Sequence, residues 1–311
     1  FLHWVAAQGW PSEFAAENDP PELNMRPIPS DETLIAQFGM PRNELIQATD
    51  LHTLTVQAWL SSRSPQAARF NGKGIKASST GFKIPLLNLA LGCDFPADTS
   101  TAEIEEEVRA VIDFFAKRNV PWYWWLNTKP SPPAIGQILE KCGLQYDSPP
   151  LPAMIAPNRQ DETSFPAHSK DIRVWRANSI ADLQAASKIR RLAFRFAEGQ
   201  AMTYFEDMHS DWLDDSSPAR LFLAGESESD PMSIGAIIEG AGIPGIYVMA
   251  TLPNQHRKGY GKAILTRLLA EASVSESRIV ALTASKAGAA LYSQFGFLHL
   301  FDFDFYSLPG Q

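Results

Sequence analysis

The chain has 311 residues, of which 45% are hydrophobic, and it carries a formal net charge of −8. It is long enough for two domains, and it contains no apolar run of about 18 residues, so we expect no membrane-spanning helix. The negative charge argues against a general nucleic-acid binder and is compatible with a cationic amine substrate. Cys93 and Cys142 are too few for a disulfide framework or a metal cluster. We expect no metal, and buried thiols in a reducing cytoplasm.

The first 40 residues are rich in proline and acidic groups and show little periodicity, which predicts an irregular arm. The opening residues FLHWVAA lack the basic region of a secretion signal, so we expect none. Residues 41–60 carry apolar side chains at helical spacing and predict a helix. Residues 61–81 are polar, basic and glycine-bearing, and we expect a mobile loop there. Its segment NGKG, at 71–74, follows no buried strand, which argues against a phosphate loop.

The region 82–157 predicts alternating strands and helices. Ser100, with Glu103 three residues later, fits a capping box in front of an amphipathic helix over 101–119. A second helix is expected to start at one of two adjacent prolines and to end at Cys142. Apolar or aromatic runs predict three strands, at 84–91, 122–126 and 152–157.

A polar, proline-bearing linker is expected at 158–169, and a second alternation of elements follows it. The expected strands are 171–177, 220–224, 233–239, 246–252, 278–283 and 298–308. The expected helices are 180–196, 202–213, 260–272 and a short one from 287 that a glycine ends.

The stretch 246–272 predicts a strand, a loop and a helix. The apolar run at 246–252 is typical of a strand buried on both faces, and Pro253 ends it. The loop QHRKGYGK, at 255–262, then opens the helix. Its glycines allow a ligand to approach the backbone closely, and the unpaired N–H groups of a helix start favour an anion. The loop therefore predicts a phosphate site, although it has neither the Rossmann spacing nor a P-loop.

A second segment, SKAGAALYSQFGF at 285–297, follows the loop HRKGYG at 256–261 by about thirty residues. Together the two segments resemble motifs of the GNAT acetyltransferase superfamily. That family has a (Gln/Arg)-x-x-Gly-x-(Gly/Ala) loop around the coenzyme A pyrophosphate, and later an Asn-x-x-Ala…Leu-Tyr-x-x-Phe-Gly-Phe segment. The resemblance covers about 170–308. It implies an α/β (α+β) fold with a mixed, mostly antiparallel twisted sheet flanked by helices, and acetyl-CoA as the cofactor.

The resemblance also implies which residues form the site. Main-chain groups of Met249, Ala250 and Thr251 would hold the pantetheine arm, with one N–H as the oxyanion donor. Tyr292 would be the general acid that protonates the departing thiolate. The other expected contacts to the cofactor are Arg257, Lys258, Gly259, Tyr260, Gly261, Lys262 and Ser285.

Three positions depart from the family pattern. His256 stands where Gln or Arg is usual, and Ser285 stands where Asn is usual. The strand at 278–283 lacks the acidic base that many members carry, so the general base must lie elsewhere. Glu239 is the favoured base, and the other candidates are Glu198, Glu206, Asp207 and His209.

The order of strands and helices in the second half also occurs in the first. We therefore expect an arm at 1–40, a degenerate GNAT-like domain at 41–160 and a catalytic GNAT domain at 170–311. Residues 124–133 contain prolines where a phosphate loop needs glycines and free N–H groups, so we expect no coenzyme A in the first domain. Its expected role is to pack against the catalytic domain and to cover part of the substrate cleft.

The sequence thus predicts an acetyl-CoA-dependent N-acetyltransferase that acts, by direct transfer, on a primary amine of a small molecule or of a peptide. Two alternatives stay open: a non-catalytic acyl-CoA-binding or regulatory module, and a GNAT-fold enzyme that uses another acyl-CoA. We expect neither a nucleic acid nor a membrane as partner.

Overall fold

The computed structural model describes residues 29–158, 171–196 and 203–310, and these residues form two compact units. The first unit contains 54–152 and 302–310, and the second contains the described residues of 29–53 and 153–301. These bounds do not coincide with the expected domains. Helix α4, Arg42–Ser61, and strands β5, Gln145–Pro157, and β11, Leu298–Ser307, each have residues in both units.

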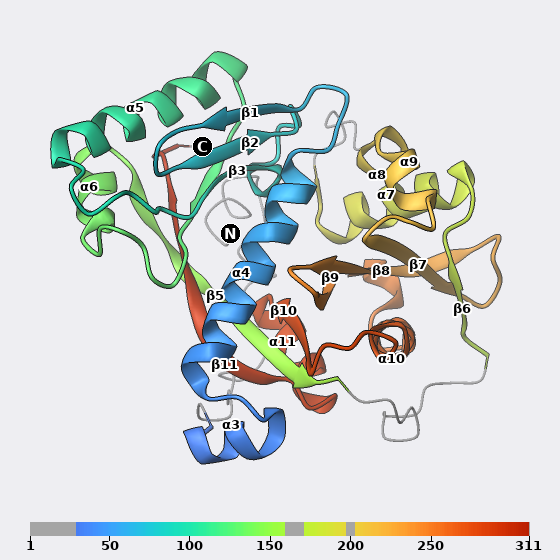
Figure 1. The fold of residues 1–311 in the computed structure, drawn as a ribbon. Helices are drawn as coiled ribbons and strands as arrows, with labels where there is room; N and C mark the ends of the chain where they lie inside the picture. The colour runs from blue at the N-terminus through green and yellow to red at the C-terminus, as the bar shows by residue number, and fades with distance from the viewer. Residues whose placement is uncertain (1–28, 159–170, 197–202, 311) are drawn as a thin grey trace, which may run out of the picture. The chain divides into compact units, whose positions relative to one another are not determined.

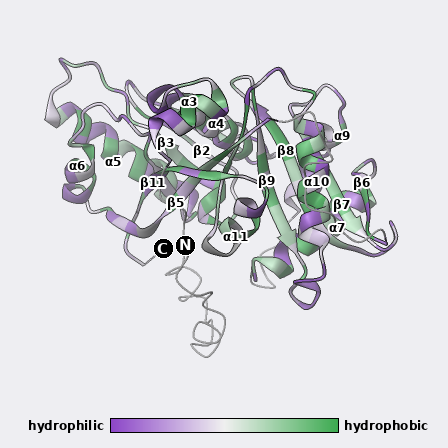
Figure 2. Cartoon of the chain, turned by 90° about the horizontal axis from the view of Figure 1, so that it is seen from below, coloured by the Kyte–Doolittle hydropathy of each residue, from purple (hydrophilic) through white to green (hydrophobic). Residues whose placement is uncertain are grey.

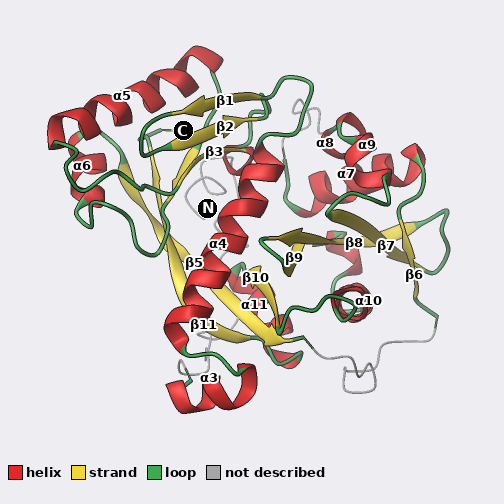
Figure 3. Cartoon of the chain, viewed as in Figure 1, coloured by secondary structure: helices red, strands yellow, loops and turns green. Residues whose placement is uncertain are grey.

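Besides its part of α4, the first unit contains a sheet and two further helices in its described residues (Figure 3). Its other strands are β1, Ala68–Asn71; β2, Lys76–Ser79; β3, Asn88–Leu91; and β4, Tyr123–Trp125. Its helices are α5, Thr101–Arg118, and α6, Ile135–Lys141, with a 3-10 turn, η1, at Pro85–Leu87. The sheet order is β1-β2-β3-β4-β11; β3 and β4 pair in parallel, and the pairs β1–β2, β2–β3 and β4–β11 are antiparallel. Phe115 of α5 stacks on Trp122 in its core, with ring centroids 4.5 Å apart.

The second unit contains the two segments that carry the GNAT-like motifs. Its strands besides β5 and β11 are β6, Arg173–Arg176; β7, Ala219–Gly225; β8, Pro231–Gly240; β9, Ile243–Thr251; and β10, Ile279–Thr283. Its helices besides α4 are α3, Asp31–Phe38; α7, Ile180–Ala193; α8, Tyr204–Asp207; α9, His209–Leu213; α10, Tyr260–Ala272; and α11, Lys286–Gln294. The order is β5-β10-β9-β8-β7-β6, and only β9 and β10 pair in parallel.

Helices cover both faces of the sheet in the second unit. Figure 1 shows α7, α8 and α9 on one side of β7 and β8, and α10 on the other. Strand β8 is coloured mostly as hydrophobic in Figure 2, and its residues 233–238 are buried, as expected for a strand covered on both faces. Helix α10 packs against β8, and its residues Ile264, Leu265, Leu268 and Leu269 are buried at helical spacing. The predicted fold class, a mixed and mostly antiparallel sheet flanked by helices, is confirmed.

Two expectations in the N-terminal part are wrong. Helix α3 lies within the expected arm: Ser30 accepts a hydrogen bond from the Thr33 N–H (3.2 Å), and the helix buries Leu34 and Phe38. Eight residues are too few for periodicity to reveal a helix. The rest of the arm, residues 1–28, and the linker 159–170 lie outside the described residues.

The expected loop at 61–81 contains the hairpin β1–β2, whose turn is the NGKG segment. Its strands are only four residues long and carry polar side chains, so they lack a strand pattern. The backbone N–H groups of Lys73, Gly74 and Ile75 donate to the carboxylate of Glu107 on α5, at 2.9, 3.1 and 2.9 Å. The N–H groups of the turn are therefore already occupied by a carboxylate of the protein itself.

The comparison of the two halves also needs a correction. The parallel strands of the first unit are β3 and β4, with α5 between them. The connection that corresponds to the loop 252–259 of the second unit is therefore 92–100, before α5, and not 124–133, which follows β4. None of the helices in the described residues is long and apolar enough to cross a membrane.

Candidate functional site

Strand β9 contains a bulge at the centre of the second unit. Ile234 of β8 pairs with Ala250 and Ala236 pairs with Tyr247, so Gly235 stands opposite both Val248 and Met249. Val248 has a φ of 56°, in the left-handed region, which a β-branched residue rarely adopts. A bulge turns the backbone groups of a strand away from its ladder. Met249 is one of the two bulged residues, and Ala250 and Thr251 follow it directly. The main-chain groups of these three residues are the ones predicted to hold the pantetheine arm.

The strands β9 and β10 diverge at the same place. Their parallel register joins Gly245 to Ala281, and in the described chain the ladder contains no further pair toward the carboxyl end of β9. Strand β9 continues to Thr251 beyond this pair. The bulge therefore lies on a stretch of β9 that has β8 as a neighbour on one side and no strand ladder on the other.

Hydrogen bonds tie down the end of β9. The buried Ser233 hydroxyl donates to the Ala250 carbonyl (2.8 Å) and lies 2.8 Å from Thr251 Oγ1. Because Ser233 has one proton, Thr251 donates in the second bond. His256 Nε2 donates to the Thr251 carbonyl (3.0 Å). His256, which replaces the usual Gln or Arg, thus closes the loop onto the strand.

The loop ends in a helix start without a side-chain cap. After the 3-10 turn η3, Pro253–Gln255, two residues are left-handed: Arg257 at φ 65° and Gly259 at φ 97°. Gly259 is the N-cap of α10. The first N–H of α10 that donates to a carbonyl among the described residues is that of Ala263, to Gly259 O (3.0 Å). The N–H groups of residues 260–262 therefore remain at the helix start, where an anion is favoured.

The side chains of the loop differ in what they offer. Arg257 and Lys258 are exposed, and Lys258 Nζ donates to Gln255 Oε1 (2.8 Å). Lys262 is half-buried. Tyr260 is buried with its hydroxyl 3.5 Å from Glu226 Oε1, and burial raises its pKa. Tyr260 can therefore offer a ligand only its backbone N–H, whereas the three basic side chains can add charge.

Helix α11 brings Tyr292 to the same end of α10. A Cβ atom on Gly261 would lie 3.5 Å from Leu291 Cδ2 and 3.9 Å from Thr251 Oγ1, so β9, α10 and α11 meet there. Tyr292 is buried, its ring packs edge-on against Phe297 (centroids 5.8 Å apart), and burial raises its pKa. The phenol therefore keeps its proton at neutral pH, as a general acid must.

Ser285 is the N-cap of α11, and its hydroxyl accepts from the Gly288 N–H at 3.1 Å. This bond gives Ser285 a structural role; its expected contact to the cofactor stays a prediction.

The expected base Glu239 is not brought to this place. It pairs with Pro244, five residues before Met249 on β9, which corresponds to about 17 Å along a strand. The other candidates on α8 and α9 are held locally. The Glu206 carboxylate accepts from the Ser187 hydroxyl, Asp207 accepts from Thr203 (2.7 Å), and His209 Nδ1 lies 3.0 Å from the Glu206 carbonyl. Glu198 lies outside the described residues.

A buried histidine that sequence reasoning missed lies where β9 and β10 diverge. His52 of α4 has its Nδ1 3.0 Å from the Gly240 carbonyl and its Nε2 3.0 Å from the Tyr247 hydroxyl. The carbonyl can only accept, so Nδ1 carries the proton and Nε2 accepts from Tyr247. Burial lowers the pKa of His52 to about 4. The imidazole also lies against Gly245, where a Cβ would overlap its Nε2.

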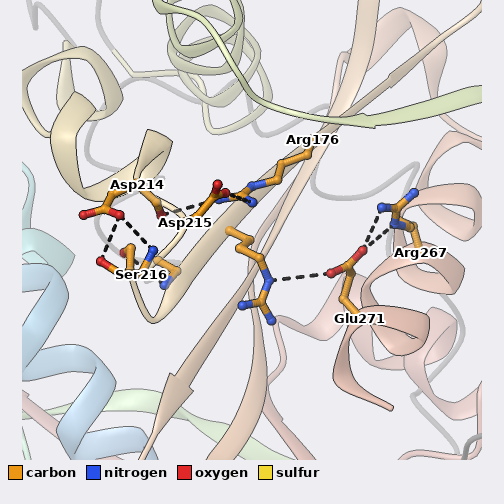
Figure 4. Close-up of polar contacts among 9 residues, drawn as sticks. Arg176, Asp214, Asp215, Ser216, Arg267 and Glu271 are labelled. Carbon is orange, nitrogen blue, oxygen red and sulfur yellow. Dashed lines mark hydrogen bonds and ion pairs between the residues drawn. The ribbon is translucent and has the colours of Figure 1, made fainter. Parts of the chain in front are cut away.

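Charged side chains fix α10 to the sheet (Figure 4). Glu271 of α10 pairs with Arg267 at 2.7 Å and with Arg220 of β7 at 3.6 Å. The guanidinium of Arg267 also lies over the ring of Phe222, 5.0 Å from its centroid. These contacts hold the helix whose start forms the candidate anion site. No group of three or more His, Cys, Asp or Glu side chains in the described residues could hold a metal ion.

No protein-family model matches the sequence, and no curated protein matches it. Solved structures do match. A GCN5-related N-acetyltransferase from Kribbella flavida is 15% identical over 84% of this chain and 96% of its own, with a TM-score of 0.62. Another, from Sphaerobacter thermophilus, is 14% identical over 84% of this chain and 92% of its own, with a TM-score of 0.55.

A tandem GNAT protein from the clavulanic acid biosynthesis pathway is 12% identical over 86% of this chain and 94% of its own, with a TM-score of 0.54. The chain therefore has the fold of the GCN5-related N-acetyltransferases over most of its length. The resemblance that the two sequence motifs indicated is confirmed at the level of the fold.

Proposed function

We propose that the chain is an acetyl-CoA-dependent N-acetyltransferase that transfers an acetyl group directly to a primary amine of a small molecule. The observation that carries the proposal is the bulge of β9 beside the uncapped start of α10. The GNAT fold supports acyl transfer as the type of reaction. When bound, acetyl-CoA supplies the thioester that the amine attacks.

The start of α10 is the proposed pyrophosphate site. Arg257 and Gly259 are left-handed, and left-handed residues next to right-handed ones can turn successive N–H groups toward one side, an arrangement that binds anions. The helix dipole adds partial positive charge, and Arg257, Lys258 and Lys262 add full charges. The N–H groups of residues 259–262 would hold the phosphates.

The bulge and Tyr292 are the proposed catalytic elements. A backbone N–H at 249–251 would stabilise the negative charge that develops on the thioester oxygen. The new C–N bond forms as the C–S bond breaks, and Tyr292 would give its proton to the departing sulfur. The amine must lose a proton to a base. Because the strand register places Glu239 far from the bulge, we propose that a chain of water molecules accepts this proton.

One observation favours the alternative, a non-catalytic acyl-CoA-binding module. Glu239, the favoured base, lies about 17 Å from the bulge along the strand. A GNAT-fold enzyme that uses another acyl-CoA would share the same pyrophosphate site. The two free cysteines, Cys93 and Cys142, fit the cytoplasm as the proposed location.

Acetyl transfer from acetyl-CoA to a panel of primary amines tests the proposal, with wild type and Tyr292→Phe compared. The phenylalanine ring keeps the contacts with Gly288 and Phe297, so the variant retains the fold. We expect kcat to fall on the order of 100-fold, with the affinity for coenzyme A unchanged. Coenzyme A binding without turnover of any amine would support the binding module, and unchanged kcat in Tyr292→Phe would remove that residue from the mechanism.

A further inference from the structure

The bulge of β9 contains a residue in a strained conformation. Val248 has a φ of 56°, and among the non-glycine residues of the described chain with positive φ it alone is β-branched. A β-branched residue rarely adopts this region, so the conformation costs free energy and persists only where the surroundings hold it. Val248 and Met249 together stand opposite Gly235. The contacts on either side of these two residues are therefore the ones that hold the bulge.

The residues after the bulge are held from β8. The buried Ser233 hydroxyl donates to the Ala250 carbonyl at 2.8 Å and accepts from the Thr251 hydroxyl at 2.8 Å. These bonds fix the carboxyl-terminal side of the bulge. The other side begins at Tyr247, which pairs with Ala236 of β8.

The residue before the bulge is held from outside the sheet, by the part of α4 that belongs to the second unit. The Tyr247 hydroxyl donates to His52 Nε2 at 3.0 Å and accepts from the hydroxyl of Thr53, the next residue of α4. His52 Nδ1 donates at 3.0 Å to the carbonyl of Gly240, the last residue of β8. Burial lowers the pKa of His52 to about 4, so the imidazole is neutral at neutral pH and its Nε2 can accept. One side chain thus bonds to both strands of the hairpin β8–β9.

A glycine of β9 makes room for this contact. A Cβ atom on Gly245 would overlap His52 Nε2 and would lie 2.7 Å from Tyr247 Cε2, closer than real Cβ atoms come to other atoms. Gly245 is also the residue of β9 that pairs with Ala281 of β10, and in the described chain the ladder contains no pair beyond it. The imidazole therefore lies where β9 leaves β10.

His52 and Tyr247 lie on the face of the sheet opposite α10. A Cβ atom on Gly235 would overlap Ile264 of α10, so Gly235 faces that helix. Because side chains alternate along a strand, Ala236 and its partner Tyr247 face the other way. The two bonded side chains therefore do not lie between β9 and α10, whose start is the proposed pyrophosphate site.

We propose that His52 is a positioning residue of the acetyl transfer. Through the Tyr247 hydroxyl it holds the bulge in the conformation in which a backbone N–H of residues 249–251 can face the thioester oxygen. This proposal rests on the proposed function. An oxyanion donor stabilises the transition state because it is held in place before the reaction, and a misplacement of about 1 Å can cost on the order of 100-fold in rate. Loss of the Tyr247 hydroxyl should therefore lower kcat and leave the affinity for coenzyme A unchanged.

The first test measures the bulge itself and needs neither cofactor nor turnover. Tyr247→Phe removes the hydroxyl and keeps the ring, whose centroid lies 5.8 Å from that of the imidazole. The three-bond coupling between the amide proton and Hα of Val248 reports its φ in NMR spectra. We expect this coupling to rise in Tyr247→Phe toward the value of an extended residue, as the strain relaxes. An unchanged coupling would overturn the proposal.

Tyr123→Phe is the matched control. Tyr123 is a buried tyrosine of the first unit whose hydroxyl bonds to Asp147, so the substitution is the same and also removes a buried hydrogen bond. We expect it to lower the free energy of unfolding and to leave the Val248 coupling at its wild-type value. A change of that coupling in Tyr123→Phe as large as in Tyr247→Phe would contradict a specific role of the Tyr247 hydroxyl.

The second test measures acetyl transfer from acetyl-CoA to an amine that wild type accepts. We expect kcat of Tyr247→Phe to fall on the order of 10- to 100-fold, with an unchanged Kd for coenzyme A. Tyr123→Phe should keep the kcat of wild type. Equal losses of kcat in the two variants would show that lower stability, and not the bulge, slows the reaction, and would contradict the proposal.

A double-mutant cycle shows whether His52 acts through Tyr247. His52→Asn keeps an N–H group for the Gly240 carbonyl and removes the acceptor at Nε2. If the Tyr247 hydroxyl transmits the effect, the double variant should lose no more kcat than Tyr247→Phe alone, whereas losses that multiply would contradict the proposal. If wild type acetylates no amine, the proposed function fails, and the Val248 coupling still decides whether His52 holds the bulge.

Discussion

Each unit of the chain contains one pair of parallel strands joined by a helix, and the two segments differ where a cofactor would bind. The segment β3–α5–β4 lies in the first unit, and β9–α10–β10 lies in the second. Their connectivity is the same. The difference between them is therefore a matter of local sequence and not of topology.

The strands stay joined in the first segment and diverge in the second. The ladder of β3 and β4 runs from Leu89 to Leu91, and beyond it the Gly92 N–H donates to the Trp125 carbonyl at 2.8 Å. The Ser131 N–H then donates to the Cys93 carbonyl at 2.9 Å. The strands of the first segment are thus hydrogen-bonded beyond their ladder, whereas in the described chain β9 and β10 have no ladder pair past Gly245. No pantetheine arm can lie between strands that are hydrogen-bonded to each other.

The helices also begin differently. In α5 the Ser100 hydroxyl accepts from the Glu103 N–H (3.3 Å) and the Glu103 carboxylate accepts from the Ser100 N–H (3.0 Å), a capping box. Hydrogen bonds from Ser100 hold the pKa of Glu103 below its usual value, so the carboxylate is ionised. It satisfies the helix start and repels a phosphate. Helix α10 has Gly259 at this position and no such group.

The comparison shows that, in the same topology, the helix start can be left open for an anionic ligand or filled by a carboxylate of the protein. In the first unit, the Glu103 carboxylate lies at the helix start that corresponds to the open start of α10, and a separate turn, β1–β2, binds the Glu107 carboxylate. In the second unit, the corresponding N–H groups are left for a ligand. The prolines at 124–133 were the reason to expect no coenzyme A in the first domain; the contrast supports that expectation on other grounds, and it stays a prediction.

The largest expected effect comes from placing a carboxylate at the open helix start, as in the first unit. Gly259→Asp puts a negative charge beside the proposed pyrophosphate. We expect the Kd for coenzyme A to rise on the order of 1,000-fold, because like charges repel by several kcal/mol at a binding site. Isothermal titration calorimetry measures the change.

Gly143→Asp is the matched control for this variant. Gly143 has a φ of 96°, against 97° for Gly259, and a Cβ there would meet no atom within 4 Å. Asp tolerates left-handed φ in both places. An equal loss of affinity in Gly143→Asp would point to strain and not to the anion site.

Acidification should have a smaller effect, on the free energy of unfolding. It acts through His52, whose imidazole lies where β9 and β10 diverge. The folded protein holds the pKa of His52 at about 4, whereas the ordinary pKa of a histidine side chain is 6.5. Between these values the unfolded chain binds a proton that the folded chain does not, so stability falls as the pH falls from about 6.5 to about 4. The loss approaches about 3 kcal/mol.

Denaturant unfolding across this pH range measures the effect in wild type and in His52→Gln. The variant cannot titrate, so its free energy of unfolding should vary less with pH. His209→Gln, a change at an exposed histidine, should leave the slope unchanged. An equal pH dependence in wild type and His52→Gln would contradict the buried, neutral state of His52.

The smallest expected effect is at the closed helix start. Ser100→Ala removes the hydroxyl that accepts from the Glu103 N–H and should lower the free energy of unfolding by about 1 kcal/mol. Thr101→Ala, at the exposed neighbouring position, should cost less. A loss as small in Ser100→Ala as in Thr101→Ala would show that the cap contributes little to the contrast between α5 and α10.

Much of the second unit could be predicted because its elements are long and its signals are local. The apolar run of β9, the glycine loop and the helical spacing of α10 each lie within a few residues of one another. A glycine at 259 is explained by its φ of 97°. The capping box of α5 was likewise visible as Ser100 followed by Glu103.

The remainder depends on contacts that sequence spacing does not reveal. His52 and Tyr247 are 195 positions apart and meet only in the folded chain. The bulge needs a register in which Gly235 faces two residues, and that register places Glu239 far from it. The prolines at 124–133 predicted the missing phosphate loop after β4, whereas the parallel pairing of β3 and β4 puts the corresponding connection at 92–100, before α5.

The most direct test of the account follows backbone amides of both segments in one titration with coenzyme A. The amides of Gly259 and Gly261 report on the open helix start, and the amide of Gly92, bonded to Trp125, reports on the closed segment. We predict saturable NMR shifts at Gly259 and Gly261 and none at Gly92. Unchanged resonances at Gly259 and Gly261 under saturating coenzyme A, or a shift at Gly92 in their place, would contradict the central claim.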